Sequence, residues 1–272
     1  MKKALVTGAS GFIGKNLTKR LVNEGFEVIS LEEINIKTVE IKSQIFSLIK
    51  NSNPSVIFHV GALANTLENN IEYMMLYNYE VTKFLSSEAR SYDIPLIYSS
   101  SAANYGVNGK YPANLYGWSK YVSEDYVLSK GGVALRYFNV YGPGEEHKGN
   151  MASFAYQAFA RNLSEGRVDI FPGNPKRDFV YIDDVIQANI DAFESYDSIA
   201  GRYYEVGSGV ASTFETVMET LGINYGYTLE SSIPVGYQFY TCSDPELWLP
   251  NWKPKFDLKS GIKTYLAYLK NN

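Results

Sequence analysis

The chain has few of the residues that build disulfide scaffolds and metal centres. It contains one cysteine, Cys242, and two histidines among 272 residues. A single thiol cannot form an intramolecular disulfide, and His59 and His147 are the only imidazoles that could bind zinc. We therefore expect neither a disulfide-stabilised fold nor a metal site.

An excess of one charge and a long apolar run are also missing. Lys and Arg number 25 and Asp and Glu number 29, which gives a net charge of −4 without any block of like charges. Binding that depends on neutralising phosphates, to nucleic acid or to an anionic membrane, is therefore not expected. The longest apolar stretch, residues 56–64, is about nine residues, well short of the roughly 20 that span a bilayer. No signal-peptide-like apolar region follows Lys2 and Lys3, so we expect a cytoplasmic protein.

Tyrosine, in contrast, is abundant. The chain contains 23 tyrosines, and aromatic residues make up 15% of it. A tyrosine combines a large apolar ring with a hydroxyl that needs a partner, which suits a polar ligand cleft. Simple drift in composition would give the same count, so this feature alone does not indicate a function.

Predicted strands and helices alternate over most of the chain. Short apolar runs predict the strands, and apolar residues at helical spacing predict the helices. The strands are expected at residues 3–7, 26–31, 56–60, 96–100 and 133–137, and the helices at 12–22, 41–49, 71–91, 115–128, 151–163, 182–193 and 258–269. Such alternation implies right-handed crossovers, so we predict an α/β fold with a Rossmann-like, doubly wound parallel sheet.

Glycines and prolines become frequent beyond Tyr141, and the predicted elements after Gly207 are short. This change predicts a second, smaller domain that is inserted into and appended to the first. We expect residues 1–141 and 178–210 to form the Rossmann domain. Residues 142–177 and 211–272 would form the smaller domain.

A glycine-rich turn, TGASGFIG at residues 7–14, follows the first predicted strand and opens the first helix. Gly8 would allow the tight turn, Gly11 would let a pyrophosphate approach the backbone, and Gly14 would let helix and strand pack closely. A turn that merely packs is the alternative. The position of the motif favours a dinucleotide.

Glu32 follows the second predicted strand and could distinguish the two nicotinamide dinucleotides. A carboxylate there accepts a hydrogen bond from the adenosine ribose 2′-hydroxyl and repels a 2′-phosphate. The segment between Leu31 and Val39 is too short for a full crossover helix and a third strand, however, so Glu32 could also be a solvated loop residue. The sequence therefore predicts NAD or NADP, with NAD favoured.

Tyr116 and Lys120 form a YxxxK pair on the predicted helix 115–128, where a spacing of four places both side chains on one face. A tyrosine with a pKa of about 10 is a weak base, but a neighbouring ammonium and a charged nicotinamide stabilise its phenolate. The serine-rich run at residues 99–106 ends a predicted strand, and Ser101 would offer its hydroxyl to the same substrate oxygen. We predict that the three residues form a catalytic group at the carboxyl edge of the sheet.

With the glycine turn, the serine-rich strand end, YxxxK and RYFNVYGP at 136–143, the chain resembles the extended short-chain dehydrogenase/reductase superfamily. Four runs are similar to the ADP-L-glycero-D-manno-heptose 6-epimerase family: YMMLYN at 73–78, SSAANYG at 100–106, HKGNMAS at 147–153 and KRDFVY at 176–181. The resemblance implies a nucleotide-sugar epimerase that oxidises carbon 6 of the heptose to an aldehyde and returns hydride to its other face. Tyr116 would serve one face of that carbonyl, and Lys148 of the HKG run would be a second acid/base for the opposite face.

The resemblance also implies binding residues for both ligands, together with homo-oligomerisation. The Rossmann domain would hold NAD(P), and the smaller domain would hold the nucleotide sugar. Cofactor contacts are expected at Gly8, Gly11, Phe12, Ile13, Gly14, Glu32, Gly61, Ala62, Asn78, Tyr116, Lys120 and Val140. Substrate contacts are expected at Asn139, Asn150, Gln157, Phe171, Pro172, Gly173, Asn174, Arg177 and Tyr237. Arg177 would suit a pyrophosphate, because a guanidinium can engage two oxygens at once.

Three features depart from the heptose epimerase pattern. Asn150 replaces the usual serine after HKG, and Gln157 replaces a substrate-contacting histidine. The short segment after Leu31 resembles dTDP-4-dehydrorhamnose reductase instead. A nucleotide-sugar reductase, another nucleotide-sugar epimerase or dehydratase, and a non-catalytic dinucleotide sensor therefore stay open as alternatives.

Overall fold

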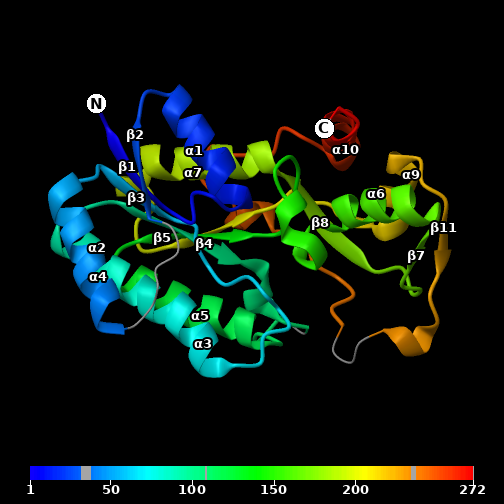
Figure 1. Ribbon diagram of the computed structural model, residues 1–272, viewed down its shortest axis with the longest axis horizontal. Coiled ribbons are helices and arrows are strands. Elements are labelled where there is room, and N and C mark those ends of the chain that lie inside the picture. Colours follow the sequence, from blue (N-terminus) through cyan, green and yellow to red (C-terminus); the bar gives the residue numbers. More distant parts are fainter. Residues whose placement is uncertain (32–37, 108, 234–236, 272) are drawn as a thin grey trace. The chain divides into compact units, whose positions relative to one another are not determined.

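A six-stranded sheet in the order β2-β1-β3-β4-β5-β9 forms the centre of the fold (Figure 1). The computed structural model describes residues 1–31, 38–107, 109–233 and 237–271. The sheet strands are β1 (Lys3–Thr7), β2 (Glu27–Leu31), β3 (Val56–His59), β4 (Leu96–Ser101), β5 (Val133–Tyr137) and β9 (Tyr203–Val206). β1 pairs in parallel with β2 and β3, and β3 pairs in parallel with β4. The predicted α/β fold with a doubly wound parallel sheet is confirmed.

The chain divides into two compact units. Unit 1 comprises Met1–Arg136 and Ile186–Tyr204, and unit 2 comprises Tyr137–Val185 and Glu205–Asn272. No helix among the described residues is both long and apolar enough to cross a membrane.

Helices cover both faces of the sheet in unit 1. Figure 1 shows α1 and α7 on one face and α2, α4 and α5 on the other. Their bounds, with those of the two short helices of this unit, are α1 (Phe12–Asn23), α2 (Thr38–Ser52), α3 (Ile71–Met75), α4 (Val81–Ser91), α5 (Leu115–Ser129), α7 (Ile182–Glu194) and α8 (Tyr196–Ile199). Leu5 of β1, Ile57 of β3 and Leu96 of β4 are all at most 2% exposed and share one apolar cluster with Leu85 of α4 and Val127 of α5. Burial on both faces explains why these strands are continuous apolar runs.

The helix predicted for residues 71–91 is not continuous. A π-helical turn at Leu76–Glu80 separates α3 from α4. The apolar spacing did not reveal the extra residue that such a turn accommodates, because one inserted residue shifts the periodicity only slightly. Short 3₁₀ helices lie at Ala102–Tyr105, Glu146–Met151, Glu230–Ser232 and Pro245–Leu247.

The described residues of unit 2 form two small sheets, the α-helices α6, α9 and α10 and short 3₁₀ helices. One sheet has the order β10-β8-β6 and the other pairs β11 with β7. The elements are β6 (Asn139–Tyr141), β7 (Val168–Ile170), β8 (Lys176–Tyr181), β10 (Ala211–Thr213), β11 (Tyr225–Tyr227), α6 (Phe154–Glu165), α9 (Phe214–Leu221) and α10 (Leu258–Leu269). The helix predicted from residue 151 begins three residues later, because the Ser153 hydroxyl accepts a hydrogen bond from the Tyr156 amide and caps α6.

Candidate active site

The glycine-rich turn joins β1 to α1, and its three glycines have different local roles. Gly8 has a φ of +63°, and a Cβ there would lie 2.6 Å from the Cα of Gly61. A Cβ on Gly14 would lie 2.0 Å from the carbonyl oxygen of Gly8. Gly11 has an ordinary φ of −73°, and its nearest contact for a Cβ is the Gly8 oxygen at 3.3 Å. Packing of the turn therefore requires Gly8 and Gly14, whereas Gly11 is the position at which a ligand could use the missing side chain.

Gly11→Ala and Gly14→Ala should consequently have different effects. Gly11→Ala keeps the turn and should leave the melting temperature nearly unchanged, while weakening dinucleotide affinity by roughly 10- to 100-fold through lost amide–phosphate hydrogen bonds. Gly14→Ala forces backbone atoms apart and should cost about 1–3 kcal/mol of stability or more. Thermal melting and calorimetric NAD titration measure the two effects. Normal NAD affinity in Gly11→Ala would show that no pyrophosphate approaches this amide.

The end of β2 lies beside this turn. The amide of Gly8 donates a hydrogen bond of 3.0 Å to the carbonyl oxygen of Leu31, the last residue of β2. Glu32, the predicted ribose contact, lies outside the described residues.

A buried histidine connects the ends of β1 and β3. His59 is 2% exposed, and its two ring nitrogens lie 2.8 Å from the hydroxyls of Thr7 and Thr82. The Thr82 hydroxyl donates to a carbonyl oxygen, so it accepts from Nε2–H of His59, and Nδ1 then accepts from Thr7. Thr7 in turn accepts from the Gly61 amide at 2.9 Å. This chain of hydrogen bonds holds the start of the loop that contains the predicted cofactor contacts Gly61 and Ala62.

His59 is the single polar residue within the apolar run 56–60, which was the signal in the sequence for a buried polar contact. Burial, with a smaller contribution from the charge of Lys120, lowers the pKa of His59 to about 3 from 6.5. The neutral ring is therefore the native form, and it can accept the hydrogen bond from Thr7.

Protonation of His59 should make unfolding pH-dependent. The unfolded state binds the proton below pH 6.5, whereas the folded state resists it down to about pH 3. The stability from this group is therefore complete above pH 6.5 and falls towards pH 3, by at most about 1.4 kcal/mol per pH unit. Urea unfolding of His59→Asn between these pH values should show a weaker pH dependence than the wild type, whereas the exposed His147 provides the control variant His147→Gln. Equal slopes in the two variants would contradict a neutral, buried His59.

Asn78 lies in the π-helical turn and connects the loop after β3, which contains Gly61 and Ala62, to α5. Its side chain accepts a hydrogen bond from the Leu63 amide and donates to the Leu63 carbonyl and to Ser119 Oγ, at 2.8, 3.1 and 2.8 Å. The Ser119 hydroxyl donates to the carbonyl of Tyr116. Asn78 is 2% exposed, so the structure places it as the residue that holds the loop after Ala62 against the helix of the YxxxK pair.

Ser101 and Tyr116 share a side-chain hydrogen bond in unit 1, and Lys120 lies one turn beyond Tyr116 on α5. Asn114 is the N-cap of α5: its side chain accepts a hydrogen bond of 2.8 Å from the Gly117 amide, and the helix begins at the next residue, Leu115. Ser101 ends β4 and accepts from the Ala103 amide at 3.1 Å. A hydrogen bond with Ser101 lowers the pKa of Tyr116, but burial raises it more, so the net shift is upward.

Without a nicotinamide, the pKa of Tyr116 is therefore raised and not lowered as expected from the charge of Lys120. Burial lowers the pKa of Lys120 to about 7, and the charge of Glu124 opposes that shift. Its Nζ lies 4.3 Å from the centre of the Tyr98 ring. Desolvation outweighs the charges because all these groups are inside the protein.

A buried network that the sequence analysis missed supports this group. Glu124 accepts hydrogen bonds from Arg136 Nε at 2.9 Å, from Ser100 Oγ at 2.6 Å and from Asn104 Nδ2 at 3.0 Å. Arg136 also donates to the Tyr105 hydroxyl at 2.7 Å. The network ties the residue before Ser101 to α5 one turn beyond Lys120. The spacing of Tyr116, Lys120 and Glu124 at four-residue intervals was the available signal.

Lys148 lines a cavity of about 240 Å³ in unit 2. The cavity also contains the predicted substrate and cofactor residues Asn139, Arg177 and Val140, together with Ser153. Burial lowers the pKa of Lys148, against the opposing charge of Glu145, and burial lowers that of Arg177. Two cationic side chains at one cavity favour a ligand that carries negative charge or exposed oxygens.

The other predicted substrate residues Phe171 and Tyr237 of unit 2 do not line this cavity but pack next to Arg177, which does. Phe171 packs edge-on against Tyr237 with ring centres 5.2 Å apart, and the Arg177 guanidinium lies 5.0 Å from the Tyr237 ring. Residues 172–174 line a different cavity, with Glu215 and Glu219 among its other residues.

The two residues that depart from the heptose epimerase pattern interact with each other. Nε2 of Gln157 donates to the Asn150 carbonyl at 3.2 Å and to the Ala152 carbonyl at 2.7 Å. Gln157 thereby caps the end of the 3₁₀ helix that contains Lys148.

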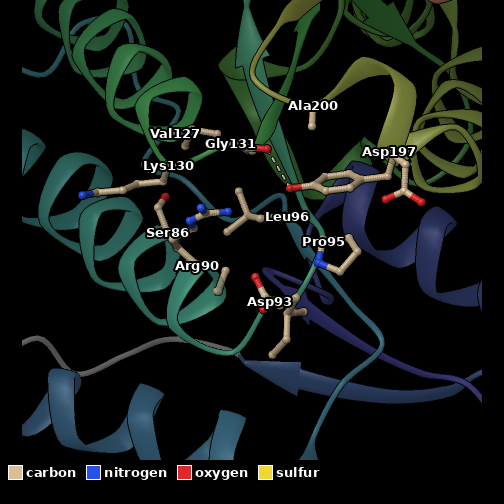
Figure 2. Close-up of a pocket in the computed structure, with 14 residues that line it drawn as sticks. Ser86, Arg90, Asp93, Pro95, Leu96, Val127, Lys130, Gly131, Asp197 and Ala200 are labelled. Carbon is tan, nitrogen blue, oxygen red and sulfur yellow. Dashed lines mark hydrogen bonds between the residues drawn. The ribbon is translucent and has the colours of Figure 1, made fainter.

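Figure 2 shows a further cavity, of about 320 Å³, in unit 1. It lies where β4 and β5 begin, since Pro95, Leu96 and Gly132 line it, and the Tyr196 hydroxyl donates to the Gly131 carbonyl beside it at 2.8 Å. None of the predicted site residues lines it. Parallel sheets bind ligands at the carboxyl ends of their strands, so we assign the candidate site to the opposite edge, where Ser101 ends β4.

The chain is similar to known epimerases in sequence and in structure. Residues 4–207 match the model of the family described as NAD dependent epimerase/dehydratase family. The ADP-L-glycero-D-manno-heptose-6-epimerase of Brachyspira hyodysenteriae is 32% identical, over 98% of this chain and 98% of the relative. The crystal structure of that enzyme from Helicobacter pylori has a TM-score of 0.86 at 28% identity, covering 100% of this chain and 97% of the other. The UDP-glucose 4-epimerase of Thermotoga maritima, solved with UDP-glucose, has a TM-score of 0.84 at 26% identity, covering 99% of both chains.

Proposed function

The chain belongs to the NAD dependent epimerase/dehydratase family, and from that membership we propose that it is an NAD(P)-dependent epimerase acting on carbon 6 of an ADP-glycero-manno-heptose. The observation that carries the proposal is that one chain contains both an oxidation group and a cavity lined by a second lysine. Ser101, Tyr116 and Lys120 form the oxidation group in unit 1, and Lys148 lines the cavity in unit 2 together with Arg177. Identity of 32% to heptose epimerases along nearly the whole chain supports the choice of substrate.

The glycine turn fits a dinucleotide. A Cβ on Gly11 would meet only the Gly8 carbonyl oxygen, at 3.3 Å, and α1 begins there without a side-chain cap and without an acidic residue in its first turn. The positive end of the α1 dipole at this turn favours phosphate oxygens. NAD or NADP, when bound, would accept hydride from carbon 6 and return it. Gly8 to Gly14, Gly61, Ala62 and Lys120 would hold it.

Tyr116 would move the first proton. It would take the proton of the carbon 6 hydroxyl during oxidation, while Ser101 donates a hydrogen bond to the same oxygen, and Lys148 would give the proton during reduction on the other face. Proton exchange with water would restore Tyr116 and Lys148 after each turnover. Because burial raises the pKa of Tyr116, the phenolate requires a positive charge nearby, and the oxidised nicotinamide together with Lys120 would supply it.

Lys148 would supply the second acid/base function. Inversion requires that the aldehyde present its other face to the hydride, so that its oxygen needs a different proton donor. Burial lowers the pKa of Lys148, against the opposing charge of Glu145, which favours release of a proton from its ammonium group. Arg177 would bind the pyrophosphate of the substrate.

Incubation of the purified protein with ADP-heptose, without added cofactor, tests the proposal. We expect the carbon 6 configuration to change in the NMR spectrum without a net change in reduced-nicotinamide absorbance. A net reductase, the second candidate favoured by the short segment after Leu31, would instead consume NADH or NADPH stoichiometrically with a 4-keto nucleotide sugar. That result would reject the epimerase.

We also propose that the protein is a homo-oligomer. Trp118 and Tyr121 on α5 are 40% and 38% exposed, and Trp118 stacks on the exposed Tyr111. Such a cluster of exposed aromatic residues is typical of protein interfaces. Light scattering after size-exclusion chromatography would show the mass of a single 30.5 kDa chain if the proposal is wrong.

A further inference from the structure

A carboxylate without a role in the proposed reaction is buried beside Lys148. Glu145 is 0% exposed. It accepts hydrogen bonds from the Gly142 amide at 3.2 Å, from the Ser153 hydroxyl at 2.7 Å and from the Ser153 amide. One side chain therefore joins the two ends of the segment 142–153, which contains Lys148.

The same residue also contacts the turn within that segment. Its backbone carbonyl accepts the Lys148 amide at 2.9 Å, and its charge raises the pKa of Lys148 against the effect of burial. Gly149, directly after Lys148, leaves the helical conformation with a φ of 52°. The orientation of the Lys148 side chain thus depends on the turn from Glu145 to Gly149, which the hydrogen bond between the Lys148 amide and the Glu145 carbonyl closes.

Burying this carboxylate is costly, and capping of α6 does not require it. Moving a charged group out of water costs about several kcal/mol of free energy unless hydrogen bonds compensate for the lost hydration. Ser153 caps α6 with its own hydroxyl, so a neutral side chain at position 145 would leave that helix start intact. The free-energy cost of burying the Glu145 carboxylate is explained if the carboxylate holds the turn 142–153 and acts on Lys148.

We propose that Glu145 is a positioning residue for Lys148, which fixes the turn that presents this lysine and places a negative charge next to its ammonium group. This inference rests on the proposed acid/base function of Lys148. Tyr265 of α10 is the titratable group that the carboxylate contacts, and Glu146 and Tyr156 act on Tyr265 in turn. Burial raises the pKa of Glu145, whereas its hydrogen bonds with Ser153 and Gly142 lower it. Burial and the charge of Glu145 raise the pKa of Tyr265, and Glu145 is the carboxylate whose charge acts on Lys148.

Three variants separate charge from geometry. Glu145→Gln keeps the shape and removes the charge, Glu145→Asp keeps the charge but shortens the reach, and Glu146→Gln removes an exposed charge one residue away. We expect kcat for epimerisation to fall about 10- to 100-fold in both Glu145 variants, since small misplacements of a reacting group cost about that much. KM should change little, and Glu146→Gln should resemble the wild type.

The second readout does not depend on epimerase activity. Acetylation of Lys148 by dilute acetic anhydride, followed by peptide mass spectrometry across pH, gives the midpoint at which the amine becomes reactive. This midpoint should move to lower pH in Glu145→Gln, because the charge that favours the ammonium form is gone, and should stay near the wild-type value in Glu145→Asp and Glu146→Gln.

The outcomes distinguish the two proposals. If the wild type does not epimerise any ADP-heptose, the proposed function fails, and the acetylation midpoints still decide whether Glu145 acts on Lys148. If the wild type is active and Glu145→Gln matches Glu146→Gln in kcat and in midpoint, the inference is wrong. Circular dichroism identifies a variant that does not fold, and in that event Ser153→Ala, which removes one hydrogen bond to Glu145, should show the same kcat loss to a smaller degree. Unchanged kcat in a folded Ser153→Ala would then overturn the inference.

Discussion

Tyr116→Phe should reduce epimerisation by about 10²- to 10⁴-fold, the usual contribution of a positioned acid/base group. The phenylalanine preserves packing in α5 and removes only the oxygen that exchanges the proton. Lys148→Met should cause a loss of similar size, because inversion requires proton transfer on both faces of the aldehyde. Initial rates of carbon 6 inversion by NMR, with NAD(P) content measured on the same samples, provide the values.

Tyr121→Phe is the matched control, since Tyr121 lies on the same helix and is 38% exposed. It should retain wild-type activity. Full loss in Tyr116→Phe with wild-type rates in Lys148→Met would reject the second acid/base function and would favour a reductase that needs a single proton donor.

Of the substitutions considered, Arg136→Met should cause the largest loss in the free energy of unfolding. Arg136 and Glu124 form an ion pair in which the side chains are 9% and 4% exposed, and the guanidinium lies 3.5 Å from the centre of the Tyr203 ring. Removing the arginine leaves the Glu124 carboxylate buried without its charged partner, which costs about 3–5 kcal/mol. The melting temperature should fall by roughly 6–20 °C, at about 2–4 °C per kcal/mol for a chain of this size.

Arg167→Met provides the comparison. Arg167 pairs with Asp169 on the surface, where the side chains are 65% and 47% exposed, and such pairs contribute about 0–1 kcal/mol. Its melting temperature should therefore stay within a few degrees of the wild type. If Arg136→Met melts like Arg167→Met, the buried network does not stabilise the position of Ser101 and α5.

The local sequence pattern was sufficient to predict an element where the burial of its apolar side chains alone decides where it lies. The strands at Lys3–Thr7 and Val133–Tyr137 and the helix at Leu258–Leu269 occur at the predicted residues, because burial of their apolar side chains sets their bounds. The helix over 71–91 was predicted wrongly as continuous, since the hydrogen bonds of Asn78 to Leu63 and Ser119 join residues 15 and 41 positions away. No periodicity encodes such contacts.

The candidate site shows the same division. The glycine turn and the YxxxK pair are visible in sequence, because backbone conformation and the spacing of four along a helix are local properties. Their electrostatics are not local: the upward pKa shift of Tyr116 and the fall of the Lys120 pKa to about 7 follow from burial by segments distant in the chain.

By itself, the sequence determined the α/β class, the dinucleotide-type turn and the identity of Ser101, Tyr116 and Lys120 as a group, since each depends on residues that are neighbours in the chain or follow a helical or strand period. Only the tertiary structure decided which polar residues support them. His59, Glu124 and Glu145 each acquire their role from partners that folding brings to them, and the local signals at His59 and Glu124 do not identify those partners. The reason is that burial and charge pairing depend on the whole environment of a side chain, which is assembled from segments that the order of residues does not place together.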